Sequence, residues 1–193
     1  DRLRDVGFPE LVMNIHCGEN EFRSEVEHLG IRAHLVHEPS IRGTAGGIAG
    51  ARPLLAPAPV IVWNGDILAE PPIPELLSAA ESGGVGLAVA PRRAGEGTVG
   101  LDARGKVVRL RGESFGTEVR GGDYVGIAAL GARALAALPP EGCLIADHVL
   151  PVLRAGGGIV GVTVAGPWTD IGSVSSYHAA NLAWLAETTG HEG

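Results

Sequence analysis

The sequence predicts an α/β fold: a Rossmann-like, mostly parallel sheet with helices on both faces and a small antiparallel β insert. Several short apolar runs, of which residues 60–63 (Val-Ile-Val-Trp) are the clearest, end abruptly in small polar turns, as strands buried on both faces of a parallel sheet do. Segments with helical spacing separate these runs, which predicts βαβ units with right-handed crossovers. Residues 92–119 carry polar residues, glycines and short alternating runs instead, which predicts the insert.

The strands are predicted from apolar runs or alternating runs that are bounded by turn residues. They are expected at residues 11–15, 31–37, 60–63, 85–90, 124–130 and 158–164. Within the insert, residues 98–101 and 106–110 flank the polar turn at 102–105, and this pattern predicts a β-hairpin.

The helices are predicted from apolar residues at helical spacing and from start and stop signals. Phe22, Val26 and Leu29 recur at that spacing before Gly30, and Ser173 is a candidate N-cap for the last helix. The apolar face expected for that last helix consists of Val174, Tyr177, Leu182 and Leu185. Helices are expected at residues 19–29, 43–55, 71–82, 131–138, 145–155 and from 173 onward, with the tail of another at residues 1–7.

The composition describes an acidic chain of 193 residues, enough for one domain with a substantial core. Its net charge is −7, and it has no cluster of Lys and Arg, so it lacks the basic surface of a nucleic-acid-binding protein. Two cysteines are too few for a disulfide framework, and no apolar run reaches the ~20 residues of a membrane helix. With no signal-peptide pattern either, we expect a cytoplasmic protein without a membrane partner.

Two carboxylates follow strand-like runs far apart in the sequence. Asp66 closes the turn Asn64-Gly65-Asp66 after residues 60–63, and Asp170 closes a similar run at Trp168-Thr169-Asp170. Ligands of open α/β sheets bind past the carboxyl ends of the strands, and Mg²⁺ favours one or two carboxylates together with substrate phosphates. The hypothesis is one metal–phosphate site shared by Asp66 and Asp170. For each Asp alone, a structural cap is an equally good interpretation.

The glycine-rich segment Gly43-Thr44-Ala45-Gly46-Gly47 is a second candidate site. It is not a P-loop, because no Gly-Lys-Ser/Thr follows, and its spacing does not fit a dinucleotide fingerprint. It offers bare backbone N–H groups at a helix start, where an anion or the edge of a nucleobase can approach. The structural alternative is a helix start packed tightly against the sheet. Zinc is disfavoured, because His34 and His37 are three apart on a strand and point to opposite faces.

In chain order, four segments together resemble the sugar-1-phosphate nucleotidylyltransferases, in the branch that holds mannose-1-phosphate and heptose-1-phosphate guanylyltransferases and muramic-acid-1-phosphate uridylyltransferase. They are residues 38–48 with the Gly-Thr-Ala-Gly stretch, Asn64-Gly65-Asp66, Gly126-Ile127, and residues 168–173 (Trp-Thr-Asp-Ile-Gly-Ser). The resemblance spans nearly the whole chain. The Asn-Gly-Asp tripeptide alone is a weak signal, whereas the ordered set is fairly specific.

The resemblance implies that a sugar-1-phosphate oxygen attacks the α-phosphorus of a nucleoside triphosphate, with GTP and a mannose-like sugar favoured, and that pyrophosphate leaves. It implies Mg²⁺ held by Asp66 and Asp170, which would be the catalytic residues, and contacts from Gly100 and Gly126 to the sugar. The nucleotide-binding residues it implies are Glu38, Thr44, Ala45, Gly46, Gly47, Asn64 and Gly65. Oligomeric state stays open, with a homo-oligomer among the alternatives.

The chain also departs from the family pattern. The family opens with a Gly-x-Gly-Thr-Arg loop and a Pro-Lys-Pro segment that cradle the triphosphate, and this sequence contains neither. It begins about one βαβ unit later, roughly 30 or more residues, so we expect an N-terminally incomplete domain. A later Glu-Lys-Pro motif is also absent, and whether Arg109 or Arg111 replaces its lysine is open.

Two other classes of function remain. A nucleotide-sugar-binding fragment or regulatory subunit would keep the pocket without catalysis, which suits the absent triphosphate loop. A metal-dependent glycosyltransferase also binds nucleotide sugars, but it requires an Asp-x-Asp motif, of which Asn64-Gly65-Asp66 has only the second acid. Fold analogy alone does not separate the first of these from the transferase.

Overall fold

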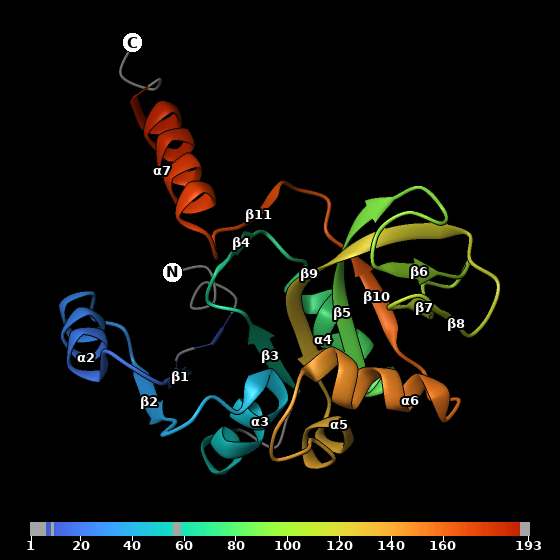
Figure 1. Ribbon diagram of the computed structural model, residues 1–193, viewed down its shortest axis with the longest axis horizontal. Helices are drawn as coiled ribbons and strands as arrows, with labels where there is room; N and C mark the ends of the chain where they lie inside the picture. Colours follow the sequence, from blue (N-terminus) through green and yellow to red (C-terminus); the bar gives the residue numbers. More distant parts are fainter. Residues whose placement is uncertain (1–6, 9, 56–58, 190–193) are drawn as a thin grey trace.

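The structure is a computed structural model that describes residues 7–8, 10–55 and 59–189 (Figure 1). The helix tail expected before Gly7 lies outside the described residues. In chain order the elements are β1 (Leu11–Ile15), α2 (Glu19–His28), β2 (Ala33–His37), α3 (Gly43–Ala51), η1 (Arg52–Leu54), β3 (Val60–Trp63), β4 (Ile67–Ala69), α4 (Ile73–Gly83), β5 (Val85–Arg92), β6 (Val99–Leu101), β7 (Val107–Leu110), β8 (Glu113–Ser114), β9 (Arg120–Leu130), α5 (Ala132–Ala136), η2 (Leu144–Val149), α6 (Leu150–Arg154), β10 (Val160–Thr163), β11 (Trp168–Asp170) and α7 (Val174–Thr189).

The α/β class is confirmed, but the central sheet is mixed. Its seven strands follow the order β10-β5-β9-β6-β7-β8, with β3 pairing with β9 as well. Strands β3 and β5 both pair antiparallel with β9, whereas β10 pairs parallel with β5. The predicted hairpin forms as β6 and β7, and β6 joins it to the central sheet by pairing with β9. Strands β1 and β2 form a separate parallel pair, as the βαβ pattern predicts.

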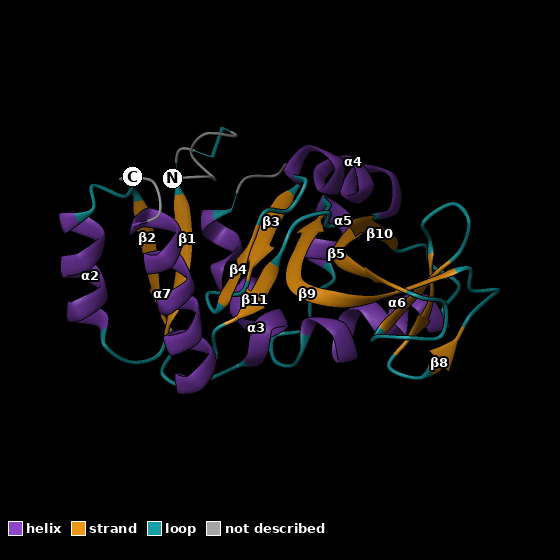
Figure 2. Ribbon diagram, turned by 90° about the horizontal axis from the view of Figure 1, so that it is seen from above, coloured by secondary structure: helices purple, strands orange, loops and turns teal. Residues whose placement is uncertain are grey.

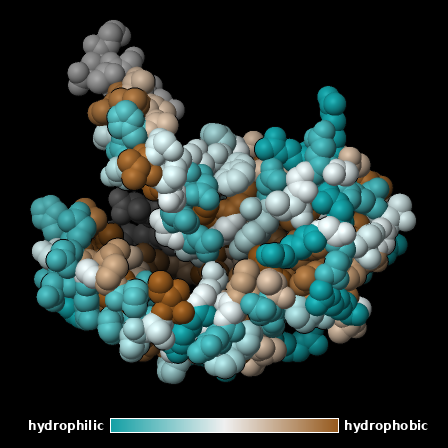
Figure 3. Space-filling model, in the orientation of Figure 1, coloured by the Kyte–Doolittle hydropathy of each residue, from teal (hydrophilic) through white to brown (hydrophobic). Residues whose placement is uncertain are grey.

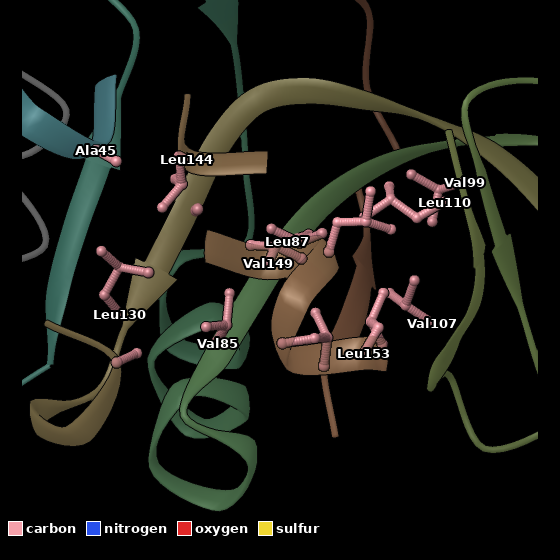
Figure 4. Close-up of a cluster of buried hydrophobic side chains, with 14 of the residues drawn as sticks. Ala45, Val85, Leu87, Val99, Val107, Leu110, Leu130, Leu144, Val149 and Leu153 are labelled. Atoms are coloured by element: carbon pink, nitrogen blue, oxygen red, sulfur yellow. The ribbon is translucent and has the colours of Figure 1, made fainter. Parts of the chain in front are cut away.

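The sheet carries helices on both faces, as predicted. On one face, Val85, Leu87 and Leu130 pack against α5, η2 and α6 in a cluster that includes Leu144 and Leu153 (Figure 4). On the other face, a second apolar cluster packs the sheet against α4; its buried members include Leu76, Ala88, Val125, Ile127 and Ala129. Because side chains alternate between the faces of a strand, neighbours such as Leu87 and Ala88 enter different cores.

Two apolar segments are less covered than the sequence suggests. The run Val60–Trp63 was expected to be buried on both faces, yet all four residues of β3 are only half-buried. The physical reason is that β3 pairs with β9 along one edge, while no strand of the described chain pairs with its other edge. An apolar run predicts that a strand lies in a sheet. It does not predict whether one or two strands pair with it.

Helix α7 projects from the body of the molecule, with apolar side chains visible along it (Figures 1 and 3). Ser173 caps it as predicted, because its Oγ accepts a hydrogen bond from the backbone N–H of Ser176 at 3.1 Å. The predicted apolar face is nevertheless exposed: Val174, Tyr177, Leu182 and Leu185 all lie open to solvent. Within the described chain, α7 packs mainly against β11.

We predict that two leucine substitutions that remove the same atoms will differ sharply in cost. Leu87→Ala empties a site that is 0% exposed and should lower the free energy of unfolding by about 2–5 kcal/mol. Leu182→Ala, at a site that is 55% exposed, should cost less than about 0.5 kcal/mol. Chemical denaturation of the three proteins measures this. Equal costs would show that the α7 face is covered in solution.

Candidate functional site

A short two-stranded ladder brings the two predicted carboxylates together. Strands β4 and β11 pair antiparallel, with Asp170 opposite Ile67, so that Asp66 and Asp170 lie at the same end of the ladder. The backbone N–H of Ile171 donates to the carbonyl oxygen of Asp66 at 2.8 Å, and this hydrogen bond fixes the two chain segments side by side. Asp66 and Asp170 are more than 100 residues apart in the sequence, and the three residue pairs of this ladder bring them together.

Both carboxylates border one point in space beside Gly172. A methyl group added to the Cα of Gly172 would lie 3.0 Å from Oδ1 of Asp170 and 3.0 Å from Oδ2 of Asp66. The N–H of Gly172 also donates to Oδ1 of Asp170 at 2.8 Å, which orients that carboxylate. Both acids are solvent-exposed, and no cluster of three or more His, Cys, Asp or Glu suited to a metal occurs in the described chain. Two exposed carboxylates that border the same point form an oxygen-rich, negatively charged site.

The turn that carries Asp66 is positioned by a bulge in β9. The N–H of Asn64 donates to the carbonyl of Gly126 at 3.0 Å, and the N–H of Ile67 returns to the carbonyl of Asn64 at 3.1 Å. Gly126 has φ = 78°, a conformation that L side chains rarely adopt, and it sits where the β5–β9 register shifts. Its carbonyl is thereby aimed at Asn64.

A cavity of about 470 Å³ lies next to this turn. Five of the predicted nucleotide-binding residues line it, namely Glu38, Thr44, Gly47, Asn64 and Gly65. Gly65 precedes Asp66 directly, so the cavity and the carboxylate pair are neighbours along the chain. A volume of this size is within the range of small-molecule sites.

Asn14, which sequence reasoning missed, organises the cavity wall. Its Nδ2 donates to Oε1 of Glu38 at 2.8 Å and to the carbonyl of Gly47 at 3.0 Å, and Asn14 lines the cavity. Glu38 is only 6% exposed, and Arg42 approaches it as well, with Nη2 at 3.9 Å from Oε1. The one available signal was a polar side chain inside the apolar run of residues 11–15, which strand alternation would have pointed at the opposite face from Met13.

The remaining residues of the predicted glycine-rich site face elsewhere. Ala45 and Gly46 are both buried and do not line the cavity. The N–H of Ala45 donates to the carbonyl of Gly142 at 2.9 Å, and Gly46 packs against the carbonyl of Pro140. Helix α3 therefore presents Thr44 and Gly47 to the cavity and its other face to the 140–142 loop, so a nucleotide contact from Ala45 or Gly46 stays a prediction.

The two glycines predicted to contact the sugar are both buried. Gly126 forms the bulge described above, and Gly100 lies against the carboxylate of Glu118. Glu118 accepts two hydrogen bonds from Arg109, from Nε at 2.7 Å and from Nη2 at 3.1 Å. These hydrogen bonds raise the pKa of the guanidinium and lower the pKa of the carboxyl. A sugar contact from Gly100 or Gly126 remains a prediction.

Arg109 and Arg111, the two candidates for the family's lysine, are placed very differently. Besides Glu118, the Arg109 guanidinium donates to the carbonyls of Gly97 and Glu96, each at 2.9 Å, so its donors are already committed to protein groups. Arg111 is exposed and has φ = 50°, in the tight turn between β7 and β8. Neither lines the cavity that holds Glu38.

No family model matches the chain. A probable mannose-1-phosphate guanylyltransferase from rice (Oryza sativa subsp. japonica) is 28% identical over an alignment 192 residues long, and the match covers 92% of this chain and 52% of that protein. The resemblance to the sugar-1-phosphate nucleotidyltransferases is confirmed. The chain spans about half the length of this curated nucleotidyltransferase relative.

Solved structures show the same fold. HddC from Yersinia pseudotuberculosis, complexed with GMP-PN, superposes with a TM-score of 0.74 at 18% identity, covering 94% of this chain and 81% of HddC. The inositol-1-phosphate CTP transferase from T. maritima gives a TM-score of 0.66 at 16% identity, covering 90% of this chain and 74% of that one. The chain thus shares its α/β fold with these two proteins over at least 90% of its length. Across the described residues, no helix is long and apolar enough to span a bilayer.

We predict that the bulge at Gly126 is required for stability. Gly126→Ala would strain the positive φ and place a methyl group 2.8 Å from Cγ1 of Ile67, lowering the free energy of unfolding by about 1–3 kcal/mol. Gly65→Ala, where nothing lies within 4 Å of the added methyl group, should change it by less than about 0.5 kcal/mol. Chemical denaturation compares the two. Equal stability of the Gly126→Ala variant and the parent would contradict the role given to the bulge.

Proposed function

We propose that this protein transfers a nucleoside monophosphate from a nucleoside triphosphate to a sugar 1-phosphate, yielding a nucleotide sugar and pyrophosphate. The observation that carries the proposal is the convergence of Asp66 and Asp170 beside Gly172, next to the cavity that holds Glu38 and Asn64. The similarity to nucleotidyltransferases in sequence and fold supports it.

The carboxylate pair fits Mg²⁺. This ion takes hard oxygen ligands, usually one or two carboxylates plus substrate phosphates and waters, and it does not need a dedicated protein cage. Asp66 and Asp170 offer two such groups around one open point, where Gly172 leaves room for the ion. When bound there, the ion would neutralise charge on the reacting phosphates.

The side chains of the protein would then act mainly by positioning. In the reaction, a phosphate oxygen of the sugar 1-phosphate bonds to the α-phosphorus while the bond from that phosphorus to the bridging oxygen breaks, and pyrophosphate leaves with the electron pair. Asn14 holds the buried Glu38 carboxylate in the cavity wall, where it can fix the nucleobase, and the Asn64 turn sets the distance from that wall to Asp66. Holding both reactants in line supplies much of the rate enhancement in such reactions.

GTP is the nucleotide we favour, with a mannose-like sugar 1-phosphate as the acceptor. A buried carboxylate such as Glu38 accepts hydrogen bonds, and guanine presents N–H donors on its Watson–Crick edge. The rice relative is a probable mannose-1-phosphate guanylyltransferase, and HddC was solved with GMP-PN. The inositol-1-phosphate CTP transferase of T. maritima has the same fold, so CTP is the first nucleotide to compare with GTP as a substrate.

The second candidate function is binding of a nucleotide sugar without catalysis of nucleotidyl transfer. The cavity is lined by β3, one edge of which pairs with no strand of the described residues, and the chain spans about half of its curated relative. Under this alternative, GDP-mannose binds near Glu38, but no pyrophosphate is released from any nucleoside triphosphate.

We predict that Asp66→Asn and Asp170→Asn each lower pyrophosphate release at least about 100-fold, because each removes a negative charge from the proposed metal site while preserving shape. Asp102→Asn is the matched control, since Asp102 caps the 104–106 turn through hydrogen bonds to two backbone N–H groups and should leave the rate unchanged. Release is followed with GTP, CTP and UTP against a panel of sugar 1-phosphates.

Two outcomes of this assay decide between the candidates. Full activity of Asp66→Asn would overturn the assignment of the carboxylate pair. Absence of release with every substrate pair, together with calorimetric binding of GDP-mannose, would favour the non-catalytic alternative.

A further inference from the structure

Strand β3 leads into the β4–β11 ladder through the turn that carries Asp66, and the ladder lies beside β3 (Figure 2). The side chain of Trp63, the last residue of β3, spans this turn. Its Nε1–H donates to the carbonyl oxygen of Ile67, the first residue of β4, at 2.9 Å. This hydrogen bond therefore encloses Asn64, Gly65 and Asp66.

The two carboxylates of the proposed metal site are positioned in different ways. Asp170 accepts a hydrogen bond at Oδ1 from the N–H of Gly172, at 2.8 Å. Among the described residues, the carboxylate of Asp66 accepts no hydrogen bond. The position of the Asp66 carboxylate therefore depends on how the backbone on either side of it is held.

Ile67 is the backbone anchor next to Asp66. The N–H of Ile171 donates to the carbonyl of Asp66, and main-chain groups alternate in direction along an antiparallel ladder, so those of Ile67 point away from β11. The N–H of Ile67 bonds to the carbonyl of Asn64 at 3.1 Å, and the carbonyl of Ile67 accepts from the indole of Trp63. Both main-chain groups of Ile67 are thus held by residues at the end of β3.

The indole of Trp63 is itself held by the core. Trp63 is half-buried and packs against the second apolar cluster, which includes Ile67, Val125 and Ile127. A ring packed in this way has little freedom to turn, so its N–H keeps one direction. Because Ile67 is only 7% exposed, water has little access to its carbonyl and does not readily replace a lost donor.

We propose that Trp63 is a positioning residue for the metal site: by holding the carbonyl of Ile67, its N–H fixes where the Asp66 carboxylate lies relative to Asp170. This role rests on the proposed function, since it requires the two acids to share a divalent cation. Trp63 itself would contact neither the ion nor the reacting phosphates. Groups that orient metal ligands from behind change metal affinity by about 10–100-fold when they are altered.

The experiment removes only the indole N–H. Trp63 is replaced by 3-benzothienylalanine, whose ring has the shape of indole with sulfur in place of the N–H. Mn²⁺ binding in the presence of GDP-mannose is measured by electron paramagnetic resonance, which needs no turnover. The Mn²⁺ affinity should fall at least about tenfold. Calorimetric binding of GDP-mannose without metal should stay unchanged, whereas a merely structural bond would affect thermal stability and leave the Mn²⁺ affinity as it is.

Two controls isolate the hydrogen bond. 7-Azatryptophan at position 63 keeps the N–H, and this protein should bind Mn²⁺ as the parent does. Replacing Trp184 with 3-benzothienylalanine makes the same atomic change on α7, where the ring is 62% exposed, and should also leave the Mn²⁺ affinity unchanged. Trp63→Phe lacks the donor as well and should weaken Mn²⁺ binding at least as much as the first analogue.

Equal Mn²⁺ affinity of the parent and the protein with 3-benzothienylalanine at position 63 would overturn the role of Trp63 and leave the carboxylate site intact. An equal loss with 7-azatryptophan would also overturn it, because the donor would not be the cause. A parent protein that binds no Mn²⁺ with GDP-mannose would instead contradict the metal site of the proposed function, and the role of Trp63 with it.

Discussion

The site depends on how strand β9 distributes its hydrogen bonds. One edge of β9 pairs with β5 along most of the length of β9. The other edge pairs with β6 near the start of β9 and with β3 near its end. The change of partner occurs around Gly126, whose positive φ no other residue type adopts easily. The bulge aims its carbonyl at Asn64 and so determines where the chain leaves β3. The turn that carries Asp66 therefore starts from this backbone conformation, and the β4–β11 ladder then holds Asp66 beside Asp170.

A second constraint is electrostatic. Asp66 and Asp170 border the same point beside Gly172, and two like charges near one another repel in the absence of a cation. The hydrogen bonds of the β4–β11 ladder hold them there regardless. A bound cation would offset this repulsion, so the carboxylate pair is a better guide to function than either Asp alone.

Much of the fold and part of the site could be predicted from the sequence, for reasons that differ between residues. An apolar run followed by a small turn and one acid places Asp66 and Asp170 at strand ends, and this signal is local. No local pattern determines the direction and partners of β9, because the run Tyr124–Leu130 does not indicate which strands lie beside it. The half-burial of β3 could not be predicted either, because it depends on which strands pair with β3. Asn14 and Glu38 meet only after β1 and β2 have paired, so their hydrogen bond has no pattern in the sequence.

The measurement that tests the central claim most directly is a crystal structure of the chain with Mn²⁺ and GDP-mannose, using the anomalous signal of the metal. We expect one peak within about 2.3 Å of an oxygen of Asp66 and an oxygen of Asp170, with the diphosphate at the metal and the guanine beside Glu38. A metal peak away from this pair, or a nucleotide sugar bound outside the cavity lined by Glu38 and Asn64, would contradict the account.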